Sequence, residues 1–416
     1  MMKTIKEQLI QSRTAKKSIL NFTDEDKINV LTAIADSLRS NVSNILEENL
    51  KDLNLMDPTD SKYDRLKLSK ERIEDLANSI IAVSKLPNPT GVLISKTNLE
   101  NGLLVEKKTV ALGVVAVIYE SRPNVTIDVA GLCIQSGNVC LLRGGSDAWF
   151  SNTCLVNLIR DAISSFGFDP NIVQLLPTDR ALVEELLHAT EFIDIIIPRG
   201  SQSLIDFVRK NAKVPVIETG AGVCHTYVDN TADLDMAARI IANAKISRPS
   251  VCNALDTILL DESIAEGFIQ KVIPYFEESK VKVIADEKSY NFWNTFGFKE
   301  LELAKEEDFG REFLDLICSV KVVEGLESAM KHIEQYSSKH SECIVSSNSK
   351  NIEEFMNKVD AAAVYANAST RFTDGGEFGL GAEIGISTQK LHARGPFALE
   401  KLVCEKWFVT GNGQIR

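Results

Sequence analysis

The sequence predicts an α/β protein built on a doubly wound parallel sheet. From Val114 onward, short unbroken runs of apolar residues recur along the chain, and segments of helical length separate them. Strands that helices bury on both faces have such continuous apolar runs, and strands that alternate with helices form parallel sheets. The predicted strands of this first cycle are 114–118, 139–142, 172–176, 193–197 and 214–217.

The segment before this sheet is predicted to be mainly helical. Apolar residues recur every three to four positions over 24–50, which indicates one helix with Thr23 as its N-cap. A second helix is predicted over 71–86. The pattern changes over 92–111, where Asn101-Gly102 separates two apolar runs and indicates a β-hairpin.

A second cycle of strands and helices begins near residue 225, and the tail over 402–409 has the character of a strand. The strand candidates are 226–228, 254–260, 282–284 and 317–323, and the helix candidates are 231–244, 262–278, 326–336 and 350–358.

The composition excludes several classes of protein. A net charge of −12 disfavours nucleic acid or an anionic membrane as the main partner, and the longest apolar run is about half the roughly 20 residues of a membrane helix. The eight cysteines include no Cys-x-x-Cys pair, and the five histidines lack helical ligand spacing. We therefore expect no metal site and a reducing compartment, the cytoplasm.

Two glycine-containing turns are candidates for cofactor contact. Arg143-Gly144-Gly145 and Asp147 follow a predicted strand and open a helix, where backbone N–H groups and the helix dipole favour an anion. Arg143 can pair with a cofactor phosphate or ribose, although a plain strand-to-helix turn explains the segment equally well.

The second turn, Gly200-Ser201, has the same position after a strand. Its hydroxyl can bind phosphate or only cap the helix, and both readings stay open.

The loop after the strand at 114–118 carries Arg122, Pro123 and Asn124. Ligands bind beyond the carboxyl ends of parallel strands in such sheets. The amide of Asn124 can donate to an oxyanion, and Arg122 can hold a carboxylate. The alternative is an ordinary surface turn around Pro123.

Cys252 is the candidate nucleophile. It lies in a loop, close in sequence to Arg248, which favours a thiolate. The turn that contains Glu218 and Gly220 lies 34 residues upstream of it. Most cysteines are inert core residues, and Cys224 is the only serious rival nucleophile.

Six segments in this order resemble the aldehyde dehydrogenase superfamily and, within it, the gamma-glutamyl phosphate reductases. The resemblance runs essentially from end to end. Its most specific pieces are 119–126, 142–145, 222–225, 243–253, 381–387 and 391–396.

The resemblance implies an aldehyde-dehydrogenase-like fold. The expected domains are a cofactor domain over 1–220, a catalytic domain over 221–400 and a final strand over 401–416. The hairpin at 92–111 and the final strand would form an oligomerisation arm, so a homodimer or higher homo-oligomer is expected. Exposed strand edges that would otherwise invite aggregation favour the same interpretation.

The resemblance also implies roles for individual residues. Cys252 corresponds to the superfamily nucleophile, and Asn124 to its oxyanion donor. The expected contacts with NADP(H) are Arg143, Gly144, Gly145, Asp147, Gly200, Ser201, Glu218, Gly220 and Glu312. The expected contacts with substrate are Arg122, Arg248, Asn253 and Arg371.

The activity implied is reduction of L-glutamyl 5-phosphate to L-glutamate 5-semialdehyde by NADPH through a thioester on Cys252, the second step of proline biosynthesis. The preference for NADP over NAD stays open, and glutamate 5-kinase is a candidate partner. Two alternatives remain: a hydrolytic aldehyde dehydrogenase that uses Glu218 as its base, and a catalytically silent scaffold.

Overall fold

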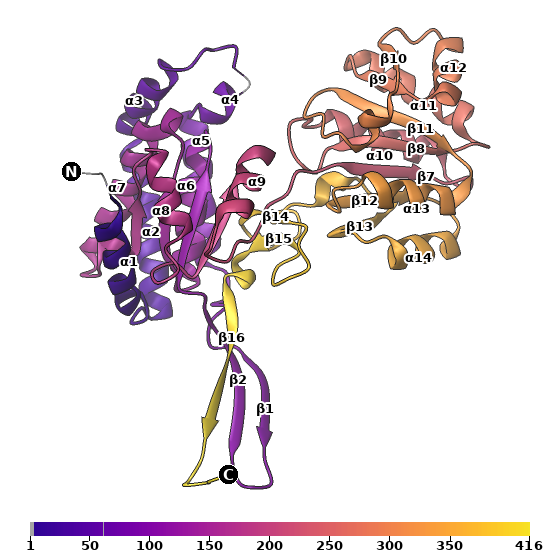
Figure 1. The fold of residues 1–416 in the computed structure, drawn as a ribbon. Coiled ribbons are helices and arrows are strands. Elements are labelled where there is room, and N and C mark those ends of the chain that lie inside the picture. The colour runs from indigo at the N-terminus through magenta and orange to yellow at the C-terminus, as the bar shows by residue number, and fades with distance from the viewer. Residues whose placement is uncertain (1–3, 61) are drawn as a thin grey trace. The chain divides into compact units, whose positions relative to one another are not determined.

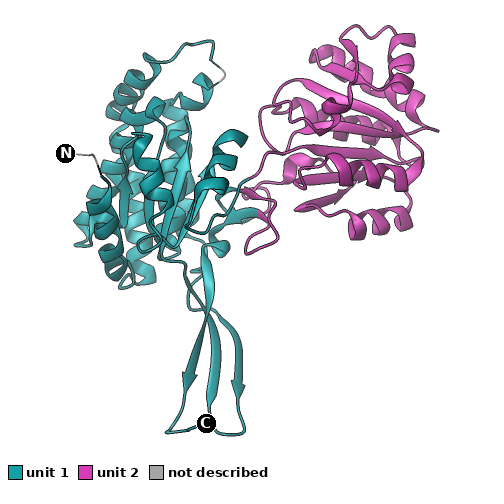
Figure 2. Ribbon diagram, viewed as in Figure 1, with its two compact units in different colours: residues 1–219, 379–385, 396–416 teal, residues 220–378, 386–395 magenta. Residues whose placement is uncertain are grey.

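The computed structural model describes residues 4–60 and 62–416, which form two compact units (Figure 2). Unit 1 contains the described residues to Thr219 together with Gly379–Gly385 and Pro396–Arg416, and unit 2 contains Gly220–Phe378 and Ile386–Gly395. The predicted division differs from these units, because residues 379–385 and 396–400 belong to unit 1. Residues 1–3 of the predicted first domain lie outside the described residues.

Unit 1 is organised around a four-stranded parallel sheet in the order β5-β4-β3-β6 (Figure 1). All six residues of β3 are buried, as expected for a central strand. The strands are β3 (Val114–Tyr119), β4 (Val139–Arg143), β5 (Val173–Leu175) and β6 (Ile195–Arg199), and the helices between and after them are α6 (Pro123–Gln135), α7 (Trp149–Ser165), α8 (Ala181–Leu187) and α9 (Gln202–Asn211).

The prediction of one helix over 24–50 is wrong, because the chain leaves the helical conformation at Asn41, where ψ is 20°. The Asn41 side chain donates to the Ser37 carbonyl and satisfies a helix-end acceptor. Thr23 is confirmed as an N-cap, since its hydroxyl accepts from the backbone N–H of Asp26. The helices are α1 (Lys6–Ile19), α2 (Asp24–Ser40), α3 (Val42–Leu53), α4 (Tyr63–Leu66) and α5 (Lys70–Ser84).

The strand predicted at 214–217 is also wrong. Only an isolated bridge joins Val216 to Ile196. Pro215 has no N–H and contributes only its carbonyl, which accepts from the backbone N–H of Ile196.

Three antiparallel strands form an arm that projects from the rest of unit 1, with the C-terminus at its tip (Figure 1). The predicted hairpin is the pair β1 (Leu93–Asn98) and β2 (Leu104–Ala111), and β16 (Val403–Thr410) pairs with β2 along its whole length. Both outer strands of the arm have exposed apolar side chains, including Leu93, Trp407 and Val409.

Unit 2 contains a seven-stranded parallel sheet in the order β10-β9-β11-β8-β7-β12-β13. Its strands are β7 (Cys224–Val228), β8 (Leu255–Asp261), β9 (Lys282–Ala285), β10 (Leu301–Leu303), β11 (Ile317–Val323), β12 (Ser341–Val345) and β13 (Ala363–Ala366). Its helices are α10 (Leu234–Ile246), α11 (Ala265–Glu278), α12 (Glu287–Thr295), α13 (Gly325–Tyr336) and α14 (Ser349–Lys358), and a separate pair of strands is β14 (Glu383–Ser387) and β15 (Gly395–Ala398).

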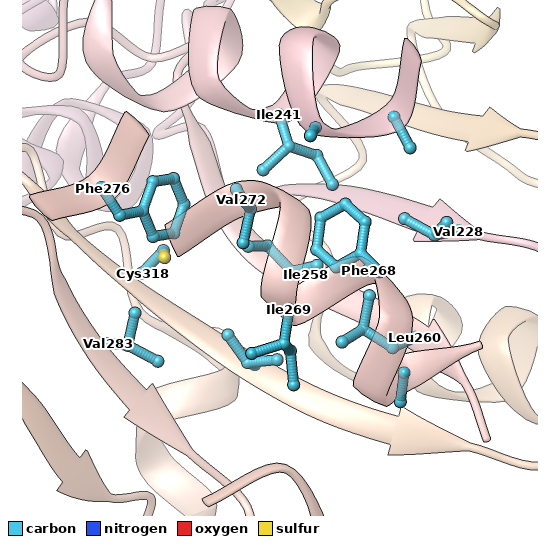
Figure 3. Packing of buried hydrophobic residues seen from close by; sticks show 14 of the residues in the cluster. Val228, Ile241, Ile258, Leu260, Phe268, Ile269, Val272, Phe276, Val283 and Cys318 are labelled. Atoms are coloured by element: carbon cyan, nitrogen blue, oxygen red, sulfur yellow. The ribbon is translucent and has the colours of Figure 1, made fainter. Parts of the chain in front are cut away.

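Successive residues of the unit 2 strands supply two different cores. On β8, Leu260 packs in a cluster with α10 and α11, whereas Leu259 packs in a second cluster with α13 and α14. Side chains alternate between the faces of a strand, so helices cover both faces of the sheet. In the first cluster, Phe268 and Val272 of α11 lie close to Ile258 and Leu260 (Figure 3). Among the described helices, none has the length and apolar character that crossing a membrane requires.

We expect Phe268→Ala to destabilise unit 2 by about 3–5 kcal/mol, because it removes a fully buried aromatic ring and leaves a cavity. The exposed Gln270→Ala on the same helix is the matched control and should change stability by less than about 0.5 kcal/mol. Urea unfolding of both variants measures the difference, and equal midpoints would contradict the described packing.

Candidate active site

The candidate nucleophile, its rival and one predicted cofactor contact lie at the amino ends of the parallel strands of unit 2. Cys224 is the first residue of β7, Cys252 precedes β8 and Glu312 precedes β11. Since these neighbouring strands run in the same direction, the three residues lie along one edge of the sheet. Ligands in parallel sheets usually lie at the opposite edge, so strand order alone does not identify this site.

Asn253 holds the nucleophile loop in place. Its side chain is 3% exposed, and its amide nitrogen donates to the carbonyls of Arg371 and Thr373 at 3.2 and 3.0 Å. Its own carbonyl accepts from the Thr370 hydroxyl at 2.8 Å. A buried amide with several partners has one preferred position, so the residue after Cys252 is fixed.

Gly222 packs directly against the backbone of Cys252. A Cβ atom at position 222 would overlap the Cys252 carbonyl, so only glycine is compatible with this arrangement. The backbone N–H of Gly222 donates to Glu312 Oε1 at 2.9 Å. Glu312, predicted as a cofactor contact, therefore braces the turn beside the nucleophile, while its contact with cofactor stays a prediction.

Cys224 is a poor nucleophile. It is fully buried, and its Sγ donates to the Cys252 carbonyl at 3.3 Å. Burial first, and then the carboxylate of Glu342, raise the pKa of its thiol well above the ordinary value. Cys252 is partly exposed, so the geometry favours it as the reactive thiol.

A buried ion pair supports the loop that carries Glu312. The Lys245 ammonium is fully buried and donates to the carbonyls of Asp315 and Ile317, both at 2.9 Å. Asp256 lies 3.7 Å from it and accepts from the backbone N–H of Phe313 at 3.1 Å. Burial raises the pKa of Asp256 to about 7, although the Lys245 charge opposes the shift.

This pair was not predicted as part of the site, and Lys245 entered only through the resemblance. The distance in sequence between Lys245 and Cys252 gives no periodic signal, because Lys245 supports the site only through the segment at the start of β11, to whose carbonyls it donates.

Two of the predicted substrate residues flank the thiol. Arg371 donates from Nη1 to Asn253 Oδ1 and from Nε to Ser247 Oγ at 3.2 Å. Arg248 is exposed and directly follows Ser247. The described structure thus brings Arg371, Asn253 and the Arg248 segment together around Cys252.

The first predicted cofactor turn, in unit 1, has features that fit an anionic ligand. Arg143 lies at the carboxyl end of β4, its Nη2 donates to the Thr178 carbonyl at 2.9 Å, and its buried Nε has no partner among the described residues. Burial and the charge of Arg180 lower the pKa of Arg143, so an added anion would stabilise it.

The glycines of this turn allow close approach of its backbone. A Cβ at Gly144 would overlap the Asn152 amide, and one at Gly145 would overlap the Asp147 carboxylate. Asp147 also accepts from the Ser121 hydroxyl. The charge of Arg143 and its buried, unpartnered Nε therefore fit an anionic group of a nicotinamide cofactor at this turn.

The second predicted cofactor turn already has an anionic partner. Glu120 accepts from the backbone N–H of Ser201 at 2.9 Å, and the Ser201 hydroxyl caps α9 by accepting from Leu204. A carboxylate at a helix N-terminus satisfies the same groups that a phosphate would use. Cofactor contact by Gly200 and Ser201 stays a prediction, and it requires the Glu120 carboxylate to move away from the backbone N–H of Ser201.

Asn124 lies in the first turn of α6, after Arg122 and Pro123, and it is exposed. Its amide nitrogen donates to Asp128 Oδ2 at 3.3 Å, and Ser79 donates to the other carboxylate oxygen at 3.2 Å. Burial raises the pKa of Asp128 to about 6. Asp128 thus orients the amide of Asn124, a role that the i, i+4 spacing on a helix could have indicated.

The turn upstream of the nucleophile places Glu218 next to a cation. Arg209 Nη1 lies 3.5 Å from Glu218 Oε2, in unit 1. At Gly220, the first residue of unit 2, a Cβ would lie 3.3 Å from Thr388 Oγ1.

Comparison with known proteins agrees with this arrangement. The sequence model of the aldehyde dehydrogenase family matches residues 3–290. A gamma-glutamyl phosphate reductase from Legionella pneumophila is 50% identical over 98% of both chains. This chain belongs to the gamma-glutamyl phosphate reductases of the aldehyde dehydrogenase family.

Other members of the gamma-glutamyl phosphate reductases match over similar lengths. The enzyme from Chlorobium phaeobacteroides is 50% identical over 100% of both chains. The crystal structure of a gamma-glutamyl phosphate reductase from Thermotoga maritima matches 99% of both chains with a TM-score of 0.94 and 41% identity. The family resemblance and the aldehyde-dehydrogenase-like α/β fold predicted from the sequence are confirmed.

We expect Gly222→Ala to lower turnover by at least about 100-fold, because the new methyl group displaces the Cys252 backbone and a shift of about 1 Å at a reacting group has an effect of that size. Gly310→Ala is the matched control, since its Cβ meets nothing closer than 3.5 Å. Steady-state kinetics measure both variants, and similar losses in the two would contradict the role assigned to Gly222.

Proposed function

We propose that this chain reduces L-glutamyl 5-phosphate to L-glutamate 5-semialdehyde and phosphate with NADPH, the second step of proline biosynthesis from glutamate. Membership of the gamma-glutamyl phosphate reductases makes it an oxidoreductase that uses a nicotinamide cofactor. The observation that carries the proposal for this site is the partly exposed thiol of Cys252, which Gly222 and Asn253 hold in one position.

Cys252 is the nucleophile of the proposed mechanism. Its thiolate attacks the C5 carbonyl carbon of the acyl phosphate, a C–S bond forms, and phosphate leaves with the electrons of the C–O bond. The backbone N–H of Cys252 is assigned to the oxyanion. Asn124 is the candidate for a second donor that the resemblance implies, and Asp128 keeps its amide oriented. Arg122 is assigned to the substrate's carboxylate.

In unit 1, the residues assigned to the cofactor are Arg143, Gly144, Gly145 and Asp147, and cofactor contact by Glu312 stays a separate prediction from the resemblance. When bound, the reduced nicotinamide supplies the hydride that converts the thioester to an aldehyde. The charge of Arg143 supports NADP over NAD, because a guanidinium can pair with the additional 2′-phosphate.

A hydrolytic reaction is disfavoured at this site. It would need Glu218 to activate water, whereas the relatives that match this chain over its full length are gamma-glutamyl phosphate reductases, whose substrate is an acyl phosphate. A thioester that meets hydride or phosphate instead of water loses nothing to hydrolysis. Association with glutamate 5-kinase is independent of this chemistry and stays a prediction.

We expect Cys252→Ala to abolish turnover, to below about 1% of the parent, while NADPH still binds. Cys224→Ala is the matched control, because its buried thiol takes no part in the reaction. Turnover is followed as semialdehyde oxidation with NADP, with and without inorganic phosphate, and cofactor binding as NADPH fluorescence.

Strict phosphate dependence of the parent enzyme supports the reductase. Steady oxidation without phosphate would instead support the hydrolytic enzyme, and residual activity of Cys252→Ala near that of Cys224→Ala would remove Cys252 from the role of nucleophile. Loss of NADPH binding in Cys252→Ala would indicate a folding defect, and a thermal transition equal to that of the parent would exclude one.

We also propose that the arm pairs with a second copy of the chain. Its outer strands β1 and β16 have exposed edges and apolar side chains, which attract another strand. We expect Val409→Glu to shift the protein toward monomer in sedimentation velocity, whereas Leu20→Glu, an equally exposed apolar position outside the arm, should leave it unchanged. A parent protein that sediments as a monomer at micromolar concentration would contradict the proposal.

A further inference from the structure

Arg371 is bonded to both ends of the segment that carries the nucleophile. Its Nε donates to Ser247 Oγ at 3.2 Å, and its Nη1 donates to Asn253 Oδ1, the residue next to Cys252. Its own backbone carbonyl accepts from Asn253 Nδ2 at 3.2 Å. The guanidinium therefore lies along the nucleophile segment and cannot leave it without breaking several bonds.

The bonding partners of this guanidinium are neutral. Its two side-chain acceptors are the hydroxyl of Ser247 and the amide oxygen of Asn253. Neither Arg371 nor Arg248 forms an ion pair with another residue in the described part of the chain. Arg248 is exposed and follows Ser247 directly, so a second positive charge lies beside the first. Burial first, and then the charge of Arg248, lower the pKa of Arg371, although the carboxylates of Asp374 and Glu377 oppose the shift.

Two neighbouring guanidinium groups that form no ion pair with a carboxylate of the described residues are suited to an anion with more than one charge. Guanidinium groups bind phosphate through paired N–H donors, and a dianion between two of them offsets the repulsion. We propose that Arg371 and Arg248 form the subsite for the phosphoryl group of the substrate, beside Cys252. This inference rests on the proposed function, and it assigns the phosphoryl group, one of the two anionic groups of the substrate, to these two arginines.

The position of the pair favours the phosphoryl group over the α-carboxylate. The phosphoryl oxygen is bonded to the carbon that Cys252 attacks, whereas three carbon atoms separate that carbon from the carboxylate. Arg371 is bonded to the residue next to the nucleophile and interacts electrostatically with Cys252, so we assign it to the group nearest the reacting carbon. The carboxylate is left to a residue further from the thiol.

The subsite acts in both directions of the reaction. In reduction, the C–O bond to phosphate breaks as the C–S bond to Cys252 forms, and the two arginines stabilise the departing phosphate. In oxidation of the semialdehyde, a phosphate oxygen attacks the thioester carbon, the C–O bond forms, and Cys252 leaves as thiolate with the electrons of the C–S bond. Inorganic phosphate is then a substrate, and its KM reports on the subsite directly.

The test compares Arg371→Met, Arg371→Lys and Arg248→Met in the oxidation of L-glutamate 5-semialdehyde. Each change to Met should raise the KM for inorganic phosphate by about 10- to 100-fold, which is the loss of one charged hydrogen-bonding partner. The KM values for semialdehyde and NADP should change by less than about threefold, and Arg371→Lys should recover part of the phosphate affinity. Arg239→Met, an exposed arginine on α10, is the matched control and should leave every constant unchanged.

A second measurement does not depend on turnover. Inorganic phosphate should slow the alkylation of Cys252 by iodoacetamide in the parent enzyme, with a concentration dependence that weakens about 10-fold or more in Arg248→Met. Arg248 has no hydrogen bond in the described structure, so a folding defect is not expected in this variant.

The outcomes separate the inference from the proposed function. A parent enzyme that oxidises semialdehyde without phosphate overturns the proposed function itself. Strict phosphate dependence with an unchanged phosphate KM in both Met variants overturns the subsite alone. A raised KM for semialdehyde with an unchanged phosphate KM also overturns it, because the arginines would then hold the carboxylate.

Discussion

The close packing of Gly222 against the backbone of Cys252 is the constraint on which the active-site structure depends. No side chain fits between the two segments, so the turn before β7 and the loop before β8 must meet backbone to backbone. Glu312 accepts from Gly222, and the buried pair of Lys245 and Asp256 holds the segment that follows Glu312. Three stretches distant in sequence are thereby held around one thiol.

This construction explains why the nearest cysteine is not the nucleophile. Cys224 lies inside the contact between the two backbone segments, and burial keeps its thiol protonated. Cys252 lies on the accessible side of the same contact, with two arginines beside its loop. Solvent access and nearby positive charge thus select one thiol of the two, and they also provide a place for an anionic substrate.

Sequence patterns predicted most of the strands and helices because apolar periodicity reports burial directly. The α/β alternation, the hairpin and the Thr23 cap follow from short-range signals of this kind. The break at Asn41 and the loss of the strand at Pro215 were missed, because apolar spacing continues across both positions while the hydrogen bonding of one residue changes.

The residues of the candidate site likewise divide into those that the sequence indicated and those that it did not. Cys252, Asn253 and Arg371 were named through resemblance, and the structure adds the contacts between them. Glu120, Lys245 and Asp256 could not be predicted as supporting residues, because each acts on a segment far away in sequence or through a carboxylate that patterns do not distinguish from surface charge.

Trapping the acyl group on Cys252 tests the central claim most directly. The parent enzyme is mixed with L-glutamate 5-semialdehyde and NADP in phosphate-free buffer, NADPH release is followed in a stopped-flow instrument, and the quenched protein is digested for peptide mass spectrometry. We predict a burst of about one NADPH per active site, an acyl group on the Cys252 peptide, and steady turnover only after phosphate is added. Steady turnover without phosphate, or an acyl group on any other residue, would contradict the account.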